Sequence, residues 1–390
     1  KPWKVFKAEE LFQNITDKNH PDETVLTIIQ GKGTLPREQA GRNIHYDDAS
    51  LSNYKKVEQG DFIIHLRSFE GGLEMANEAG IVSPAYTILR CKRPHSSLFY
   101  DAYFHTDEFI NHNLSKSVEG IRDGRQISYE AFKWLGIPYC EPTEQEKISN
   151  LFAALNERIA KQRDLIEALK KYKRGLSNSL FDRLSAGSES RLCIFGDMMT
   201  ILQNNTFSRD NLSVGDNGVR NIHYGDVLIK YGAVLDLHSE NVPVINAEQD
   251  ISKFSALSYL RNGDVVFADT AEDYTVGKST EIIGAENIAA LSGLHTIPCR
   301  PQDSFVPMYL GYYFNSDYFK KQLYPMIQGT KVSSISKSEI IKTKIIVPCL
   351  QEQARIASIM SALDDRIDAA KHTTKDLIDL RSGLLQQLFI

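Results

Sequence analysis

The amino-acid sequence predicts an α+β fold in which two mixed α/β domains are each followed by one long helix. The first supporting observation is a repeat, because the segment 143–184 recurs at the end of the chain, in 351–389, at a constant offset of 208 residues. Both copies carry an apolar pattern of helical period, and the stretches before them share an order of short motifs. A tandem duplication explains these observations together.

The two copies of the repeat align without a gap. Identical residues occur along the whole segment, at apolar and polar positions alike, so the similarity extends over about ten helical turns. The matched pairs are Glu144/Glu352, Gln145/Gln353, Ile148/Ile356, Leu155/Leu363, Arg158/Arg366, Ile159/Ile367, Leu169/Leu377, Gly175/Gly383, Leu176/Leu384, Leu180/Leu388 and Phe181/Phe389.

Each copy is predicted to be a helix that pairs with another helix. A capping box, Thr143-x-x-Glu146, follows Pro142, and apolar residues then alternate in steps of four and three. Such an a/d seam is typical of a left-handed coiled coil. Alternatively, each helix covers only its own domain, but a seam of about 40 residues far exceeds the usual helix of roughly 11. The predicted pairing residues are Ile148, Phe152, Leu155, Ile159, Ile166 and Leu169 in the first copy, and Ile356, Met360, Leu363, Ile367, Leu377 and Leu384 in the second.

The repeat divides the chain into domain, helix, domain and helix. The predicted boundaries are 1–142 for the first domain, 143–184 for its helix, 185–190 for a linker of small residues, 191–348 for the second domain and 349–390 for the second helix.

The two domains share a scaffold but differ in their loops. The motif RNIHY occurs at 42–46 and again at 220–224, and a Gly-Asp turn before an apolar strand follows in both. The two motifs are 14 residues apart in the first domain and 39 in the second, counted from the Tyr to the Gly. Similar scaffolds with different loops are expected to bind different targets.

Composition excludes several classes of protein. A hydrophobic content of 42% and a charged content of 24% are ordinary for a globular chain, and no apolar run approaches the ~18 residues of a membrane helix. The five cysteines are scattered without a CxxC pair, so we expect a reduced, cytoplasmic protein without structural zinc. The net charge of −5 requires any nucleic-acid surface to be a local one.

No motif predicts catalysis. Gly277-Lys278-Ser279 resembles the end of a phosphate-binding loop, but Glu272 stands where that loop needs glycine. Pro21-Asp22 followed by Gln30-Gly31-Lys32 is a weak match to a nuclease site that lacks its second acid. The histidines form no H-x-x-x-H pair. We therefore expect no metal, no cofactor and no catalytic residue in this chain.

Polar loops are better candidates for DNA contact. Equivalent loops before a short helix carry basic and hydroxyl residues, which can contact guanine or phosphate, although each could also be a solvated surface group. Gly175 and Gly383 lie inside the long helices, either for close helix packing or as docking notches for a partner. The candidate DNA-binding residues are Arg122 and Arg125 in the first domain, Lys331, Ser333, Ser334 and Lys337 in the second, and, with less support, Arg67, Lys230, Tyr231 and Lys278.

The duplicated helix pattern EQxxI…L…L(N/D)xRI…L…GL…LF, together with the GIVSPAY segment and the Gly-Asp turns, resembles the specificity subunits of type I restriction-modification systems. The resemblance covers essentially the whole chain. It implies two target-recognition domains related by a pseudo-two-fold axis, separated by an antiparallel coiled coil of the two helices. Each domain would read one half of a bipartite, asymmetric site in double-stranded DNA.

The same resemblance implies partners that carry the chemistry. Two methyltransferase (modification) subunits would bring S-adenosylmethionine, and restriction/translocase subunits would bring ATP and Mg²⁺, while the specificity subunit itself is not catalytic. Independently, a helix of about 60 Å exceeds one DNA turn of about 34 Å, which agrees with a gapped site. The main alternative is a coiled-coil scaffold or adaptor whose two domains bind proteins. A retained nuclease or methyltransferase activity is the weakest alternative.

Overall fold

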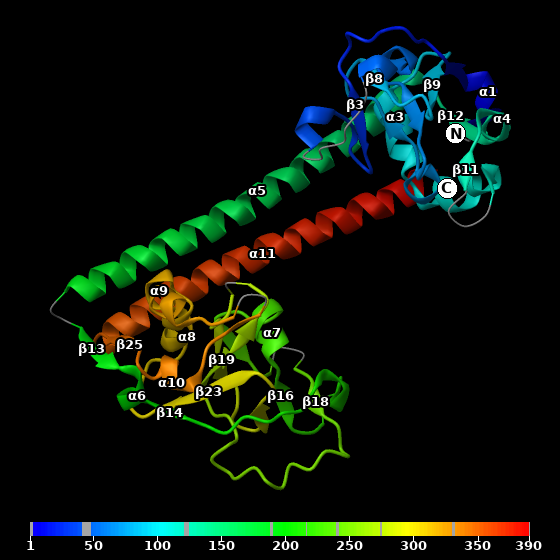
Figure 1. The fold of residues 1–390 in the computed structure, drawn as a ribbon. Helices are drawn as coiled ribbons and strands as arrows, with labels where there is room; N and C mark the ends of the chain where they lie inside the picture. Colours follow the sequence, from blue (N-terminus) through cyan, green and yellow to red (C-terminus); the bar gives the residue numbers. More distant parts are fainter. Residues whose placement is uncertain are drawn as a thin grey trace. The chain divides into compact units, whose positions relative to one another are not determined.

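The computed structural model shows two compact units. Unit 1 comprises Lys1–Arg163 and His372–Ile390, and unit 2 comprises Asp164–Lys371. The long helices α5 (Pro142–Ala186) and α11 (Leu350–Phe389) each contribute a segment to both units (Figure 1). The structure describes residues 3–40, 48–120, 125–187, 190–215, 217–238, 242–273, 275–329 and 332–389.

Unit 1 is built on an antiparallel sheet of order β2-β9-β6-β7. All three residues of its strand β6 (Phe62–Ile64) are buried, because helix α3 covers the sheet with aromatic side chains such as Phe104, whose ring lies 4.9 Å from that of Phe62. Gly72 has φ 87° and lies so close to the Phe104 carbonyl that a Cβ would not fit. The other described elements are β1 (Lys4–Lys7), α1 (Ala8–Leu11), β2 (Phe12–Ile15), β3 (Leu26–Ile29), β4 (Gly33–Pro36), β5 (Lys55–Val57), α2 (Ser68–Gly71), β7 (Glu74–Met75), β8 (Gly80–Val82), β9 (Thr87–Cys91), α3 (Ser97–Phe104), β10 (Val118–Glu119), β11 (Gln126–Ile127), α4 (Tyr129–Phe132) and β12 (Gly136–Tyr139).

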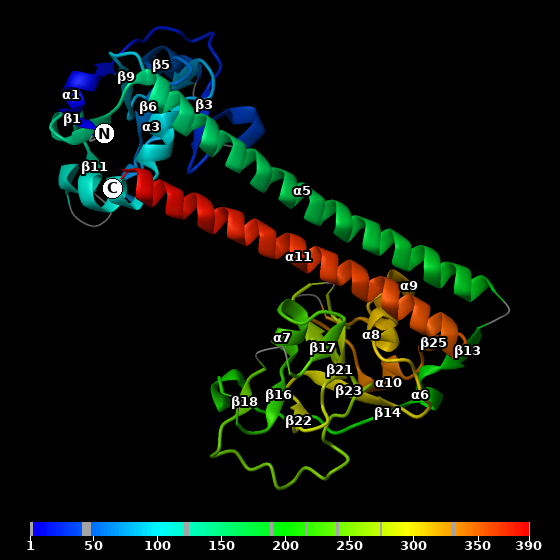
Figure 2. The same ribbon diagram turned by 180° about the vertical axis from the view of Figure 1, so that it is seen from behind.

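Unit 2 contains two larger sheets, of order β14-β23-β19-β21-β17 and β15-β18-β16-β22. Figure 2 shows strands of the first sheet side by side, with α8 between that sheet and α11. The pairs β17–β21 and β16–β22 are parallel, and the other pairs within these sheets are antiparallel. The elements are β13 (Arg191–Ile194), α6 (Phe195–Met198), β14 (Met199–Ile201), β15 (Leu212–Ser213), β16 (Arg220–Ile222), α7 (Tyr224–Ile229), β17 (Val234–Asp236), β18 (Val244–Ile245), β19 (Val265–Ala268), β20 (Thr270–Ala271), β21 (Ser279–Ile283), β22 (Ala290–Ser292), β23 (Thr296–Pro301), α8 (Tyr309–Phe314), α9 (Asp317–Leu323), β24 (Ser333–Ser334), α10 (Lys337–Ile340) and β25 (Lys344–Val347).

The long helices complete the core of each unit. In unit 1, the Phe389 ring of α11 lies 5.5 Å from Trp3 and 5.2 Å from Phe99, and Ile148 and Phe152 of α5 belong to the same apolar cluster. In unit 2, the corresponding cluster includes residues of α5 and α11, namely Leu180, Phe181, Ile356 and Met360. The contacts therefore divide each predicted helix between two units, whereas the sequence assigned each helix to a segment of its own.

The two helices contact each other within both units. In unit 2, Lys173 pairs with Asp364 at 2.5 Å and Arg183 pairs with Glu352 at 3.0 Å, so the helices run antiparallel there. In unit 1, Arg381 donates a hydrogen bond to Asn156 at 2.8 Å. Among the predicted pairing residues, the buried ones are Ile148, Phe152, Ile159, Ile356, Met360, Leu363 and Ile367, and the half-buried ones are Leu155, Ile166, Leu169, Leu377 and Leu384.

Several buried polar contacts recur in both units. The Gln145 amide accepts from the Ser96 backbone and donates to the Cys140 carbonyl, and the matching Gln353 accepts from Val306 and donates to Pro348. A side chain that bonds two loops at once fixes where the long helix starts, because leaving a buried amide without partners is costly.

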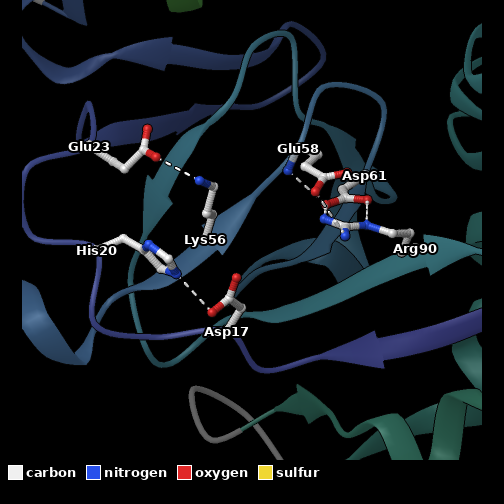
Figure 3. A network of polar contacts seen from close by, with 7 residues as sticks. All are labelled: Asp17, His20, Glu23, Lys56, Glu58, Asp61 and Arg90. Atoms are coloured by element: carbon white, nitrogen blue, oxygen red, sulfur yellow. Dashed lines mark hydrogen bonds and ion pairs between the residues drawn. The ribbon is translucent and has the colours of Figure 1, made fainter.

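A buried Asp–Arg pair also recurs. Asp61 accepts two hydrogen bonds from Arg90 at 2.8 and 2.7 Å, and Asp264 accepts two from Arg300 at 2.9 and 2.6 Å. Figure 3 shows the unit 1 pair, with Glu58 also directed toward Arg90. Each aspartate follows a glycine of positive φ, so the same Gly-Asp turn places the carboxylate beside its arginine in both units.

Among the described residues, no helix is long and apolar enough to cross a membrane.

The seam between the helices can be tested with one buried and one exposed leucine of α11. Leu363→Asp should lower the free energy of unfolding by about 3 kcal/mol or more, because it buries a charge without a partner. The control Leu380→Asp, at a side chain that is 51% exposed, should change it by less than about 0.5 kcal/mol. Chemical denaturation measures both, and equal stability of the two variants would show that Leu363 does not pack in a seam.

Candidate nucleic-acid interface

A buried carboxylate in unit 2 holds two basic side chains together at the surface. Helix α7 starts after His223, whose Nδ1 accepts from the Gly225 backbone, and this places Asp226 in the first turn. Asp226 is buried, and its two oxygens pair with Arg209 at 2.7 Å and with Lys230 at 3.0 Å. We call Arg209, Asp226 and Lys230 the α7 clamp.

The α7 clamp presents positive charge to solvent. Burial alone would raise the pKa of Asp226, but hydrogen bonds from Arg209 and Lys230 hold that pKa below its usual value. The Arg209 side chain is 49% exposed and the Lys230 side chain 59% exposed. One carboxylate thus fixes two cations, which leaves a net positive charge on rigidly positioned donors, as phosphate or a guanine edge requires.

Exposed aliphatic side chains lie beside the α7 clamp. Ile229 is 85% exposed and Val214 is 81% exposed, which is unusual for β-branched residues of this size. Both line the same surface cavity as the clamp, with a volume of about 490 Å³. Apolar groups next to an arginine can contact thymine methyl groups while the arginine contacts guanine. The remaining lining residues are Leu212, Ser213, Gly225 and Pro243.

The structure places the predicted residues near α7 in different environments. Lys230 belongs to the α7 clamp. Tyr231 is only 2% exposed, and its ring lies in an apolar cluster with Ile222 and Val227, so it has no surface with which to contact DNA. Lys278 is half-buried and donates to the Leu228 carbonyl at 2.9 Å, which makes it a structural contact in this conformation.

The predicted serine loop of unit 2 is partly a strand. Ser333 and Ser334 form β24, which pairs with β20, and Ser334 is exposed. The hydroxyl that caps helix α10 belongs to Ser336, which accepts from the Glu339 backbone. Lys337 is exposed and donates to Asn204 at 3.2 Å. Lys331 lies outside the described residues.

In unit 1, the described candidates lie around α2. The Arg125 guanidinium stacks over the Phe69 ring at 4.2 Å and lies 3.8 Å from Glu70. Arg67 precedes α2 and is exposed, next to Leu66, which is 64% exposed. Basic and aliphatic groups therefore share this surface too, while Arg122 lies outside the described residues.

The two helix glycines are not needed for packing within their own units. A Cβ added at Gly175 or at Gly383 would meet no atom within 4 Å. The packing explanation is therefore wrong within the described chain, and docking of a partner stays a prediction. No group of three or more His, Cys, Asp or Glu that could hold a metal occurs among the residues that the structure describes.

Comparison with known proteins identifies the class. Residues 197–379 match the family model of the type I restriction modification DNA specificity domain. This region contains the α7 clamp, most of unit 2 and the greater part of α11. Residues 197–379 are therefore similar to a DNA specificity domain. The resemblance to type I specificity subunits that the sequence predicted is confirmed.

Solved structures share the fold over nearly the full length. One comes from work on complex assembly and conformational transition of the type I R-M system, with a TM-score of 0.62, 19% identity and coverage of 99% of this chain and 97% of that one. The HsdS subunit from Thermoanaerobacter tengcongensis matches with a TM-score of 0.53 and 19% identity, over 99% of this chain and 96% of that one. The type I restriction-modification system S subunit from M. genitalium matches with a TM-score of 0.54 and 14% identity, over 100% of this chain and 96% of that one. The predicted mixed α/β fold with a long C-terminal helix is thus confirmed, and no curated protein matches with significance.

Proposed function

We propose that this chain is the specificity subunit of a type I restriction-modification system, in which each unit reads one half of a bipartite, asymmetric DNA site. The observation that carries this proposal is the specificity-domain match of unit 2. The recurrence of the Gln145/Gln353 contacts and of the buried Asp–Arg pair supports extending the same role to unit 1. Such recurrence is expected if the units arose by tandem duplication.

The long helices act as the spacer between the two readers. The proposal of an antiparallel coiled coil is supported by the burial of the predicted seam and by the Lys173–Asp364 and Arg183–Glu352 pairs. A paired helix resists bending better than a single one, so the spacer would hold the gap between half-sites constant. This rigidity is what distinguishes a bipartite reader from a flexible scaffold.

The α7 clamp is the proposed base-contacting surface of unit 2. The surface around Arg67 and Arg125 is the proposed counterpart in unit 1. In both, basic groups adjoin exposed aliphatic ones. Within the DNA-reading proposal, Lys337 and the exposed Ser334 contribute phosphate contacts in unit 2.

The chemistry would be supplied by partners. Two methyltransferase subunits, bringing S-adenosylmethionine, would dock on the long helices near Gly175 and Gly383, where open space leaves the backbone accessible. Restriction/translocase subunits would bring ATP and Mg²⁺. The chain itself would hold no cofactor and carry out no covalent step.

The purified chain alone should neither cleave nor methylate DNA when Mg²⁺, ATP and S-adenosylmethionine are supplied. Addition of the cognate methyltransferase subunit should restore methyl transfer to adenine, which serves as the positive control. Incorporation of labelled methyl groups is the measurement. Turnover by the chain without its partner would contradict the proposed division of labour.

Arg209→Ala should relax base preference within one half-site only, at a cost of about 1–3 kcal/mol in specific binding, because a bidentate base contact is lost. The control Arg261→Ala removes an exposed arginine of unit 2 outside the clamp cavity and should leave the preference unchanged. Arg125→Ala should affect the other half-site. Selection of randomised half-sites by the methyltransferase complex is the measurement, and a change at both half-sites in one variant would contradict independent readers.

A further inference from the structure

A second cavity in unit 2, of about 560 Å³, lies among α5, α9 and α11. Its size is typical of small-molecule sites. It is separate from the α7 clamp, since the two cavities have no lining residue in common. Basic side chains surround it, among them Lys173, Arg174 and Lys320, although the whole chain has a net charge of −5.

The two aspartates that line this cavity already bind neighbouring side chains. Asp317 accepts from the Arg174 Nε at 2.7 Å and from the Asn178 amide at 2.9 Å through the same oxygen. Asp364 pairs with Lys173 at 2.5 Å through one oxygen and accepts from the Tyr312 hydroxyl at 3.0 Å through the other. Three of the four carboxylate oxygens of these two residues are therefore engaged, while the two terminal nitrogens of Arg174 take no part in its bond to Asp317.

Lys320 is the group that lacks a partner. Its side chain is half-buried, and its ammonium makes no ion pair or hydrogen bond with any residue that the structure describes. Burial lowers the pKa of Lys320; Asp317 opposes this shift and Arg174 adds to it. A second half-buried lysine, Lys278, is close enough to repel it. A partly buried cation without a partner is costly, and an incoming anion would remove that cost.

We propose that this cavity binds a small phosphate-bearing anion, with Lys320 as its main charge partner and Arg174 as a second donor. Phosphate suits the site because it offers several acceptor oxygens to ammonium and guanidinium groups. Lys170 and Lys371, which also line the cavity, are paired with Glu167 and Asp368. They therefore add positive electrostatic potential but are not the main contacts of the bound anion. The exposed ring of Tyr324 lines the same cavity and offers a surface to a group attached to the phosphate.

An occupied site would brace the long helices against unit 2, because its ligand would contact α5 and α9 at once. The proposed anion site does not depend on DNA recognition, so each proposal can be tested without the other. An acidic side chain of a protein partner could fill the same cavity, and the experiment below separates that case.

Pyrophosphate is the probe, titrated calorimetrically into the full chain at constant ionic strength, with thermal unfolding as a second readout. Wild type should bind it with one site and show a raised Tm. Lys320→Met keeps the aliphatic stem and should weaken binding about tenfold or more, with loss of the Tm shift. The matched control Lys321→Met changes the next residue of α9, which is exposed and outside the cavity, and should behave as wild type.

Equal pyrophosphate affinity of the Lys320→Met and Lys321→Met variants would overturn the proposal, as would a Tm shift no larger than that from sodium chloride. Binding of the methyltransferase subunit or of duplex DNA that depends on Lys320, without any binding of pyrophosphate, would also overturn it, because the cavity would then serve a macromolecular partner. A variant that fails to fold is recognised by its circular dichroism, in which case Lys320→Gln takes its place in the same comparison.

Discussion

The packing of α5 against α11 is the interaction on which the rest of the structure depends. Neither unit has a complete core without residues from both helices: Phe389 closes the aromatic cluster of unit 1, and Phe181 with Ile356 closes that of unit 2. The buried amides of Gln145 and Gln353 then fix where each helix starts. Because apolar burial contributes about 25 cal/mol per Å², these contacts tie the folding of each unit to the pairing of the helices.

Charge in this protein acts locally. A net charge of −5 does not favour binding of nucleic acid. Nevertheless, Asp226 holds Arg209 and Lys230 close together on one surface patch, and Lys320 and Arg174 both line the second cavity. Asp226 orients both basic groups of the α7 clamp, whereas in the second cavity Asp317 orients Arg174 only. The buried Asp61–Arg90 and Asp264–Arg300 pairs differ, since there the arginine and the acid satisfy each other and hold the sheet.

The sequence predicted the order of elements and the fold class because a gap-free repeat and a helical period can both be recognised in the sequence alone. It did not predict the α7 clamp, since Arg209 lies in a short 3-10 helix, Arg209–Asn211, that meets Asp226 of α7 only in the folded chain. The spacing of Asp226 and Lys230 by four residues was a usable signal. Tyr231 was predicted to contact DNA, but it follows the end of α7 and its ring is buried in an apolar cluster, which a single tyrosine in the sequence does not reveal. Ser333 and Ser334 were predicted to lie in a loop but form the strand β24, whose two residues are too few to show a period.

The central claim is that the paired helices set the distance between two independent readers of DNA. It is tested most directly by deleting one heptad from each helix, 166–172 and 365–371, which adjoin the Lys173–Asp364 pair and keep the seam in phase. About 10 Å of spacer is lost, which corresponds to roughly three base pairs. In a selection with randomised half-sites and randomised gap, the account predicts a gap shorter by about that amount and unchanged half-site sequences. An unchanged gap, or altered half-site sequences, would contradict it.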